Sequence, residues 1–490
     1  MTLCIDGHDF HYEMENLCRV FFPEKKINIV SKPCDDDLFV YTGIKSGAVG
    51  IKITVYVKNG SVKKEKSIFL PPDKASEKHE PERNMGVLLF SILTEICGFK
   101  PQWGILTGVR PVKLLGNLME KMGERAAAGY FQDKLLVSKE KAELARDVFA
   151  NEQKILSMES SDSFSLYIGI PFCPTRCAYC SFVSSSVDKT FKLIPKYVDL
   201  LCEEIKYTAK VTADLKLRLM SVYIGGGTPT VLTAGQLGKI LDTVNGSFNM
   251  SSCKEITVEA GRPDTITEEK LYAIKKRGVG RISINPQTLS DNVLQAIGRK
   301  HTTAQTFSAF RLSRKCGFKN INMDIIAGLP RDDESGFKKT VDGVIALSPE
   351  SITVHTLALK RAAKLFQDTA VAKEPYADAA AAGNMIGYAD TVLPANGYIP
   401  YYLYRQSRMA GNLENTGWAK PGFENLYNVF IMEERQTILA CGCGAATKLK
   451  EPYSGRLERI FNFKYPYEYI RRFDEIIGRK DLVKKFYDGY

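Results

Sequence analysis

The sequence predicts an α/β protein built around a partial (β/α)6 barrel, with an α+β domain before the barrel and an extension after it. Three observations predict this fold. Short β-rich runs alternate with amphipathic helical segments between residues 163 and 395, residues 1–155 follow a different pattern, and residues 396–490 become rich in Tyr, Gly and Asn. Strands that alternate with helices run parallel, because a helical crossover returns the chain to the same end of the sheet.

Six β-then-α units follow one another in the barrel region. In chain order their strands are SLYIGI, LMSVYIGGG, EITVEAG, RISINPQ, INMDIIAGLP and SITVHTLAL. In such folds the reactive groups lie on loops after the carboxyl ends of the strands. A site is therefore expected at that end of the predicted barrel.

The flanking segments predict two further regions. Residues 1–155 contain strand-like runs such as GIKITVYVKNG, followed by helices that end in SKEKAELARDVFANEQKIL, and this change of pattern predicts a separate α+β domain. Residues 396–490 include YIPYYLYRQSRMAGNLENTGW, which predicts a polar and aromatic extension that covers the barrel mouth.

Composition narrows the class of protein. The chain has 490 residues, of which 44% are hydrophobic and 25% charged, as in ordinary globular proteins of two or three domains. Its apolar stretches are too short or too interrupted to cross a bilayer, and its start lacks the features of a secretory signal, so a cytoplasmic location is expected. The net charge of +11 permits an anionic partner. The basic residues match no nucleic-acid module, so we expect no nucleic-acid partner.

Three cysteines stand close together in YIGIPFCPTRCAYCSFVS, directly after the first barrel strand. Cys173, Cys177 and Cys180 form a C-x3-C-x2-C motif on a loop that contains two prolines. Without an export signal such cysteines stay reduced, which favours a metal or catalytic role over disulfides. Three thiolates can hold three corners of a [4Fe–4S] cluster, and the fourth iron then stays open to a small molecule.

Zinc sites are the alternative interpretation of these cysteines. Structural zinc needs four Cys or His ligands, and only the distant Cys441 and Cys443 could complete such a set. A second metal site at Cys4, His8 and His11 is also conceivable, although CIDGHDFHY is better interpreted as a hairpin with an Asp-Gly turn.

Polar groups and glycines recur after the later strands. The run Gly225-Gly226-Gly227-Thr228 follows the second strand, and the missing side chains would let backbone groups approach an amino-acid-like cofactor. Convergent polar side chains at the ends of, or just after, later strands could hold that ligand over the cluster. These are Glu259, Gln287, Arg299 and Asp324.

The motifs resemble a known superfamily. The three-cysteine motif, with Tyr179 before the third cysteine and GGGTP further on, resembles the radical S-adenosylmethionine (radical SAM) enzymes. YIGIPFC, VEAGRPDT, RISINPQTL, IGRKH and DIIAGLP resemble the oxygen-independent coproporphyrinogen III oxidase group. WGILTGVRPVKLL, SITVHTLALKRA, GNLENTGWAKPG and IFNFKYPYEYI resemble its HemZ-type branch, so the resemblance covers nearly the whole chain.

The resemblance implies two cofactors and their ligands. It implies that Cys173, Cys177 and Cys180 bind a [4Fe–4S] cluster, and that a reductant such as flavodoxin or ferredoxin supplies the electron that cleaves S-adenosylmethionine to a 5′-deoxyadenosyl radical. It assigns no catalytic side chain. The implied S-adenosylmethionine site comprises Tyr167, Tyr179, Gly225, Gly226, Thr228, Glu259, Gln287, Arg299 and Asp324.

The resemblance also implies a tetrapyrrole substrate. In the group's best-known reaction, two propionates of coproporphyrinogen III become the vinyl groups of protoporphyrinogen IX, a step of haem biosynthesis. Basic groups near the site are candidate partners for the substrate carboxylates. They are Arg262, Arg299, Lys300 and Lys360.

Two departures leave other tetrapyrrole functions open. Phe182 stands where the well-characterised oxidases have a fourth cysteine, and AGNLENTGWAK keeps Asn412 and Trp418 but lacks the histidine of the related haem chaperones. The alternatives are a haem-binding chaperone and a radical enzyme that methylates haem or opens its ring. His355, at the end of a predicted strand, could contact a tetrapyrrole or bind haem iron, although a strand histidine is more often an interior group.

Overall fold

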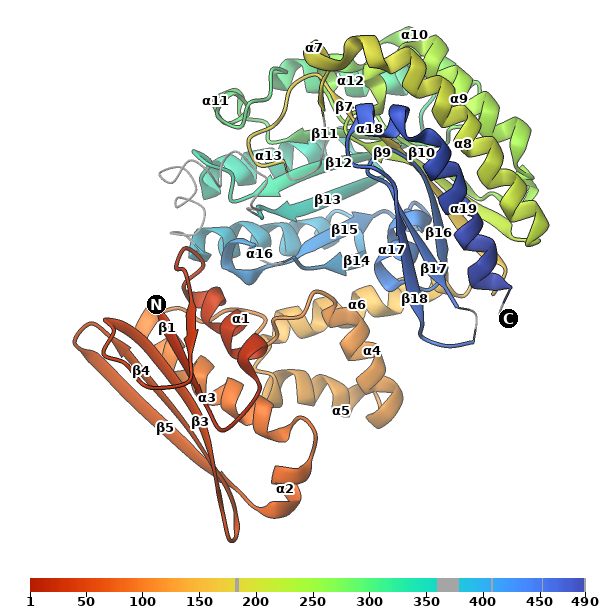
Figure 1. The fold of residues 1–490 in the computed structure, drawn as a ribbon. Helices are drawn as coiled ribbons and strands as arrows, with labels where there is room; N and C mark the ends of the chain where they lie inside the picture. Colours follow the sequence, from red (N-terminus) through yellow and green to blue (C-terminus); the bar gives the residue numbers. More distant parts are fainter. Residues whose placement is uncertain (181–184, 359–378, 407–408, 452, 489–490) are drawn as a thin grey trace. The chain divides into compact units, whose positions relative to one another are not determined.

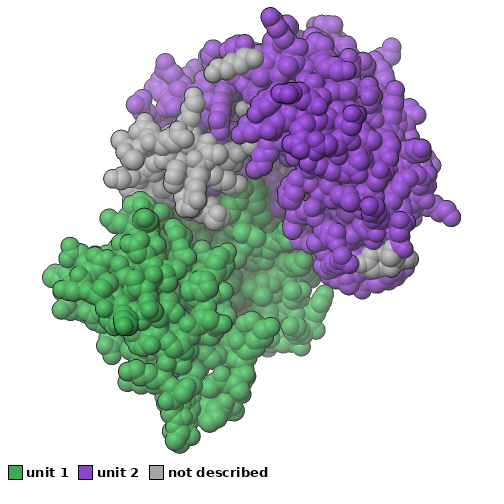
Figure 2. Space-filling model, viewed as in Figure 1, with its two compact units in different colours: residues 1–149, 370–383, 403–414 green, residues 150–369, 384–402, 415–490 purple. Residues whose placement is uncertain are grey.

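The computed structural model of the chain describes residues 1–180, 185–358, 379–406, 409–451 and 453–488. The chain forms two compact units, each of which combines segments that are far apart in sequence (Figure 2). Unit 1 contains Met1–Phe149, Ala370–Gly383 and Leu403–Glu414, and unit 2 contains Ala150–Thr369, Asn384–Tyr402 and Asn415–Tyr490. The division into 1–155, 163–395 and 396–490 stays a prediction. Within the described ranges, none of the helices combines the length and hydropathy needed to cross a bilayer.

Unit 1 contains a five-stranded mixed sheet with the strand order β2-β1-β3-β4-β5 (Figure 1). Its strands are β1 (Thr2–Asp6), β2 (Asn28–Val30), β3 (Leu38–Gly47), β4 (Gly50–Asn59) and β5 (Val62–Leu70). Helices α1 (His11–Phe21) and α3 (Glu80–Cys97) share a hydrophobic core with this sheet. Because helix α1 follows β1 after residues 7–10 and β1 pairs in parallel with β3, the hairpin predicted at Asp6-Gly7 is wrong.

The remaining helices of the N-terminal region are α2 (Pro72–Ser76), α4 (Pro111–Met122), α5 (Glu124–Gly129) and α6 (Lys139–Leu156). A late segment of the chain completes the core of unit 1. Trp103 Nε1 donates a hydrogen bond to Glu414 Oε2 over 2.6 Å, and Lys141 pairs with the same buried carboxylate. Arg405 Nη1 donates to the carbonyl of Leu106 over 2.8 Å. Part of the predicted C-terminal extension is therefore built into unit 1.

Unit 2 contains the predicted partial barrel. Six strands run parallel in chain order, as the sequence predicts. They are β6 (Ser163–Ile170), β9 (Arg218–Gly226), β10 (Glu255–Glu259), β11 (Arg281–Gln287), β12 (Asn320–Ala327) and β13 (Ser351–Thr356). Nearly every residue of β6 is buried, as expected for a strand covered on both faces.

Helices follow these strands on the outside of the sheet (Figure 1). They are α8 (Ile194–Asp214), α9 (Ala234–Ser247), α10 (Glu268–Lys275), α11 (Asp291–Ala296), α12 (Thr303–Lys315), α13 (Glu334–Leu347) and α16 (Ala379–Ala395), with the short α7 (Val187–Thr190) before α8. Helix α12 was not predicted, although Thr302 and Gln305 form a reciprocal capping box at its start.

The C-terminal region lengthens the sheet at both edges. β15 (Asn415–Ala419) pairs antiparallel with β13, and β14 (Ile399–Tyr404) follows it in the sheet order. At the other edge β16 (Thr437–Gly442) pairs in parallel with β6, followed by β17 (Ala446–Lys450) and β18 (Leu457–Phe461). The helices are α17 (Leu426–Glu433), α18 (Pro466–Arg471) and α19 (Phe473–Tyr487). That this region covers the barrel mouth stays a prediction.

Candidate active site

The thiol loop leaves the carboxyl end of β6 and is fixed by hydrogen bonds to the turn after α11. Cys173 lies in β7 (Phe172–Cys173), which pairs with β8 (Ser185–Ser186). Ala178 N donates to the carbonyl of Ile297 over 2.9 Å, and Thr175 Oγ1 donates to the carbonyl of Gly298 over 3.1 Å. All twelve cysteines of the chain are thiols rather than disulfides. The three clustered thiols are therefore held on one loop at the end of the barrel where a site was predicted.

Two arginines flank the middle of this loop. Arg262 Nη1 lies 3.7 Å from Cys177 Sγ, within hydrogen-bonding range for sulfur, while Arg299 Nη2 lies 3.2 Å from the hydroxyl oxygen of Tyr179. Burial raises the pKa of the Tyr179 phenol, so it stays protonated. Arg262 was predicted to meet substrate carboxylates, but it is only 3% exposed and its guanidinium binds Asp264.

The glycine run packs directly against the thiol loop. Gly227 N donates to the carbonyl of Ile170 over 2.7 Å, and Thr228 N donates to the carbonyl of Phe172 over 2.8 Å. A Cβ atom on Gly227 would lie 2.5 Å from the Phe172 oxygen and 3.0 Å from Cys173 Sγ. Thr228 Oγ1 donates to the same sulfur over 3.6 Å. The missing side chain thus allows β9 and the thiol loop to approach each other.

Three tyrosine rings stack beside the glycine run. Tyr167 of β6 and Tyr223 of β9 are register partners, and their ring centroids lie 6.3 Å apart. Tyr427 of α17 stacks on Tyr223 at 4.6 Å and on Tyr167 at 6.0 Å. Sequence analysis missed Tyr223, although strand alternation places it on the same face as Gly225. No local signal connected Tyr427 with this site.

Glu259 meets this aromatic cluster at the end of β10. The Tyr223 hydroxyl donates to Glu259 Oε1 over 2.7 Å, and a Cβ on Gly225 would lie 2.9 Å from the same carboxyl group. Burial raises the pKa of Glu259 to about 7, and the nearby charge of Asp324 also raises it. Glu259 can therefore change its charge near neutral pH.

The next three strands, β11, β12 and β13, contribute further polar groups. Asn322 Nδ2 donates to Asp324 Oδ1 over 2.6 Å, and His355 Nε2 lies 3.7 Å from Asp324 Oδ2. Burial opposes ionisation of Asp324, but the hydrogen bond and charge of His355 bring its pKa below the usual value. Gln287 is 6% exposed, has a φ of +70°, and its Oε1 has no hydrogen-bond partner among the described residues.

The structure describes only some of the other predicted residues. Lys300 is exposed beside Arg299, whereas Lys360 and Phe182 lie outside the described residues. Asn412 Nδ2 donates to the Leu106 carbonyl within unit 1, and Trp418 is buried in β15.

The alternative zinc sites gain no support from the described residues. Cys443 Sγ contacts the carbonyl of Lys464 at 3.0 Å, and His8 Nε2 lies 3.2 Å from the carbonyl oxygen of Thr42. Across the described ranges, no three His, Cys, Asp or Glu side chains are arranged to hold a single metal ion.

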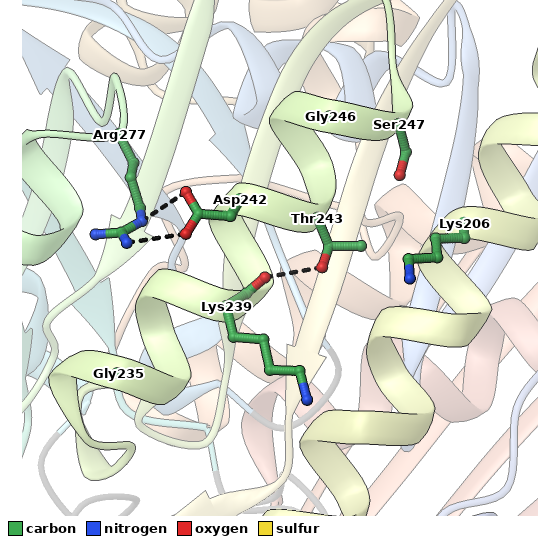
Figure 3. Close-up of a pocket in the computed structure, with 8 residues that line it drawn as sticks. All are labelled: Lys206, Gly235, Lys239, Asp242, Thr243, Gly246, Ser247 and Arg277. Carbon is green, nitrogen blue, oxygen red and sulfur yellow. Dashed lines mark hydrogen bonds and ion pairs between the residues drawn. The ribbon is translucent and has the colours of Figure 1, made fainter.

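A hollow of about 520 Å³ lies outside the barrel, between α8, α9 and the end of α10. Figure 3 shows Arg277 and Asp242 facing each other at its wall, with both guanidinium contacts drawn. None of the predicted site residues lines it. The hollow is therefore separate from the candidate active site.

Comparison with known proteins identifies one superfamily. The family described as "Radical SAM superfamily" matches residues 167–344. The chain is 34% identical to "Oxygen-independent coproporphyrinogen-III oxidase-like protein HemZ" of Bacillus subtilis (strain 168), over 98% of this chain and 97% of that protein. It is 35% identical to "Heme chaperone HemW" of the same organism, over 40% of this chain and 51% of that protein.

One solved structure supports the fold. Coproporphyrinogen III oxidase (HemN) from Escherichia coli, described as a radical SAM enzyme, aligns with a TM-score of 0.51 and 23% sequence identity. The alignment covers 66% of this chain and 71% of that chain. At this identity the likeness concerns the fold alone.

Proposed function

Because this chain belongs to the radical SAM superfamily, in the family of oxygen-independent coproporphyrinogen-III oxidase-like proteins, we propose that it decarboxylates coproporphyrinogen III oxidatively in haem biosynthesis. The cofactors of this superfamily are a [4Fe–4S] cluster and S-adenosylmethionine. One observation carries the proposal: the similarity to the oxidase-like relative extends over 98% of the chain, whereas the chaperone of the same organism matches 40%.

The donor set of the thiol loop fits an iron–sulfur cluster. Cys173, Cys177 and Cys180 are reduced thiols on one short loop, which is the donor set that binds iron–sulfur clusters, and the guanidinium of Arg262 lies beside Cys177 Sγ. The three cysteines would hold three irons. The fourth iron would then be left for S-adenosylmethionine.

The surroundings of the loop also fit S-adenosylmethionine. Gln287 Oε1 is a buried acceptor without a described partner, and an ionised Glu259 would attract an ammonium group. A residue with a side chain at Gly225 would collide with Glu259. The proposed binding residues remain Tyr167, Tyr179, Gly225, Gly226, Thr228, Glu259, Gln287, Arg299 and Asp324.

The bound cofactors would supply a carbon-centred radical, which removes one hydrogen atom from each reacting propionate. The substrate radical then loses carbon dioxide and passes one electron to an external one-electron acceptor. A vinyl group is left in place of the propionate. The exposed ammonium of Lys300 is suited to hold a carboxylate of the substrate other than that of the reacting propionate. The stacked rings of Tyr167, Tyr223 and Tyr427 would keep water from the radical.

Anaerobic turnover tests this proposal. The reconstituted full-length protein is incubated with S-adenosylmethionine, coproporphyrinogen III and reduced flavodoxin or dithionite. We expect 5′-deoxyadenosine and a porphyrinogen lighter by two formic acid units in mass analysis. Formation of 5′-deoxyadenosine with unchanged coproporphyrinogen would reject the substrate.

A second candidate function is haem carriage, favoured by the His355–Asp324 contact of 3.7 Å. A carboxylate beside a histidine is the usual outer partner of a metal-bound imidazole. Haem titration into the pure protein separates the candidates. Carriage through His355 requires a shifted Soret band that His355→Ala abolishes, and an unchanged Soret band counts against it.

A further inference from the structure

Arg262 occupies an unusual position for an arginine. It follows β10 in the run VEAGRPDT, and only 3% of its surface is exposed. Nη1 lies 3.7 Å from Cys177 Sγ and donates to Thr175 Oγ1 over 3.1 Å. Both contacts are made to the thiol loop. One guanidinium nitrogen therefore joins the turn after β10 to Cys177 and to Thr175.

Asp264 fixes the orientation of this guanidinium. Arg262 Nε and Nη2 donate to the two carboxylate oxygens of Asp264 over 3.1 and 3.2 Å. Burial opposes ionisation of Asp264, but Arg262 keeps the pKa of this carboxyl below its usual value. A two-pronged pair of this kind has a fixed geometry. Because Asp264 occupies one edge of the planar group, Nη1 on the other edge remains directed at the loop.

The charge of Arg262 bears directly on any cluster held by this loop. Reduction adds one negative charge to the cluster and its thiolates, and an arginine side chain keeps its proton at every working pH. Because Asp264 balances the charge of Arg262 on the opposite edge of the guanidinium, the hydrogen bond from Nη1 to Cys177 Sγ is the contact through which Arg262 favours the reduced form. Hydrogen bonds to sulfur, net charge and burial are the features that set iron–sulfur potentials.

We propose that Arg262, oriented by Asp264, is a positioning residue that raises the reduction potential of the cluster through its hydrogen bond to Cys177 Sγ. This inference rests on the proposed function, since it takes Cys177 as a cluster ligand. In this role Arg262 makes it easier for the cluster to accept an electron. The substrate carboxylates must then be held by other cations.

The test is a potentiometric titration of the reconstituted full-length protein without S-adenosylmethionine, followed by electron paramagnetic resonance of the reduced cluster. In Arg262→Gln the shorter neutral side chain cannot reach the sulfur. We expect the one-electron equilibrium to shift at least tenfold toward the oxidised cluster, a fall of about 59 mV. Arg262→Lys, which keeps the charge and loses the planar fork, should give a smaller fall.

The chain offers a matched control in Arg277. Its Nε and Nη2 hold Asp242 at 2.8 and 2.9 Å in the same two-pronged geometry, at the outer hollow of Figure 3. Arg277→Gln removes one arginine charge and one such pair without touching the thiol loop. We expect the potential of this variant to equal that of the unaltered protein.

The outcomes separate this inference from the proposed function. If Arg262→Gln keeps its iron and sulfide and its potential equals that of Arg277→Gln, the inference is wrong and the proposed function stands. If Arg262→Gln loses the cluster, the reduction potential of Arg262→Lys is the deciding measurement. A potential of Arg262→Lys equal to that of the unaltered protein overturns the inference. If the unaltered protein takes up no cluster, both fail together.

Discussion

Glu204 of α8 and Lys480 of α19 form an ion pair of 2.7 Å whose side chains are 0% and 5% exposed. The Tyr469 hydroxyl donates to Glu204 Oε2 over 2.6 Å, and Gly442 N donates to the same oxygen over 2.8 Å. Burial opposes the charge of Lys480, but Glu204 raises its pKa overall, so the ammonium persists. This cluster joins α8 to the C-terminal helices and to the end of β16.

Removing Glu204 should destabilise unit 2 strongly. In Glu204→Ala the ammonium of Lys480 stays buried without its partner, which costs about 3–5 kcal/mol of unfolding free energy. Denaturant unfolding followed by circular dichroism measures this loss. The control is Asp199→Ala, which removes the exposed partner of Lys239 and should cost about 1 kcal/mol or less. Equal losses in the two variants would contradict the importance of the buried pair.

Binding of S-adenosylmethionine should depend on pH through Glu259. Burial raises the pKa of this carboxyl from 4.5 to about 7, so below pH 7 it is mostly neutral and attracts an ammonium group weakly. Affinity should rise as pH increases toward 7 and level off above it. Equilibrium binding between pH 5.5 and 8.5 measures this profile, and Glu259→Gln should flatten it. A profile that Glu259→Gln leaves unchanged would assign the dependence to another group.

The same shift makes an opposite contribution to stability without ligand. The folded protein binds the Glu259 proton more tightly than the unfolded chain, whose carboxyl titrates near 4.5. The stability from this proton is therefore fully present below pH 4.5 and is lost as pH rises through about 7. Comparing unfolding of the apoprotein with that of Glu259→Gln over this range should show the loss in the unaltered protein alone.

Replacing Gly227 should separate β9 from the thiol loop. The Cβ of Gly227→Ala would lie 2.5 Å from the backbone oxygen of Phe172, so one of the two segments must move. We expect reconstituted protein to hold much less iron and sulfide, as measured by chemical analysis. Gly246→Ala is the control, because a Cβ there meets nothing within 4 Å. In α9 that change should stabilise the helix by roughly 0.5–1 kcal/mol.

The three clustered cysteines should each be necessary for the cluster. Alanine at Cys173, Cys177 or Cys180 should abolish iron and sulfide uptake, because each thiolate would hold a different iron. Cys202→Ala is the control, since Cys202 is buried in α8, away from the motif. Full iron content in any of the three single variants would remove that cysteine from the ligand set.

Much of the fold could be predicted from local patterns. The six parallel strands of unit 2 were predicted because each is a short buried run followed by a helix. The pairing of β16 with β6 was not, because its two strands stand more than 260 residues apart and pair by tertiary contact. For the same reason no pattern showed that Glu414 would pack against Trp103 in unit 1.

The candidate site shows the same limit. Strand ends predicted where Glu259 would stand, because parallel strands present their carboxyl ends together and Glu259 is the last residue of β10. Asp324 was expected at or just after the end of a strand, but it lies within β12 (Asn320–Ala327). Their binding roles stay predictions. Net charge could not show that Arg262 is buried and Lys300 is exposed. Asp264, an acidic residue two positions after Arg262, was nevertheless a signal that this arginine is ion-paired. Tyr427 enters from α17, which no motif connected with the barrel.

The pairing of β6 with β16 has a consequence for synthesis of the protein. Translation releases residues 163–170 long before residues 437–442, so one edge of β6 has no neighbour until β16 has been synthesised. An unpaired strand edge is open to association with other chains. The nascent polypeptide therefore depends on residues 437–442, made more than 260 residues later, to cover this edge.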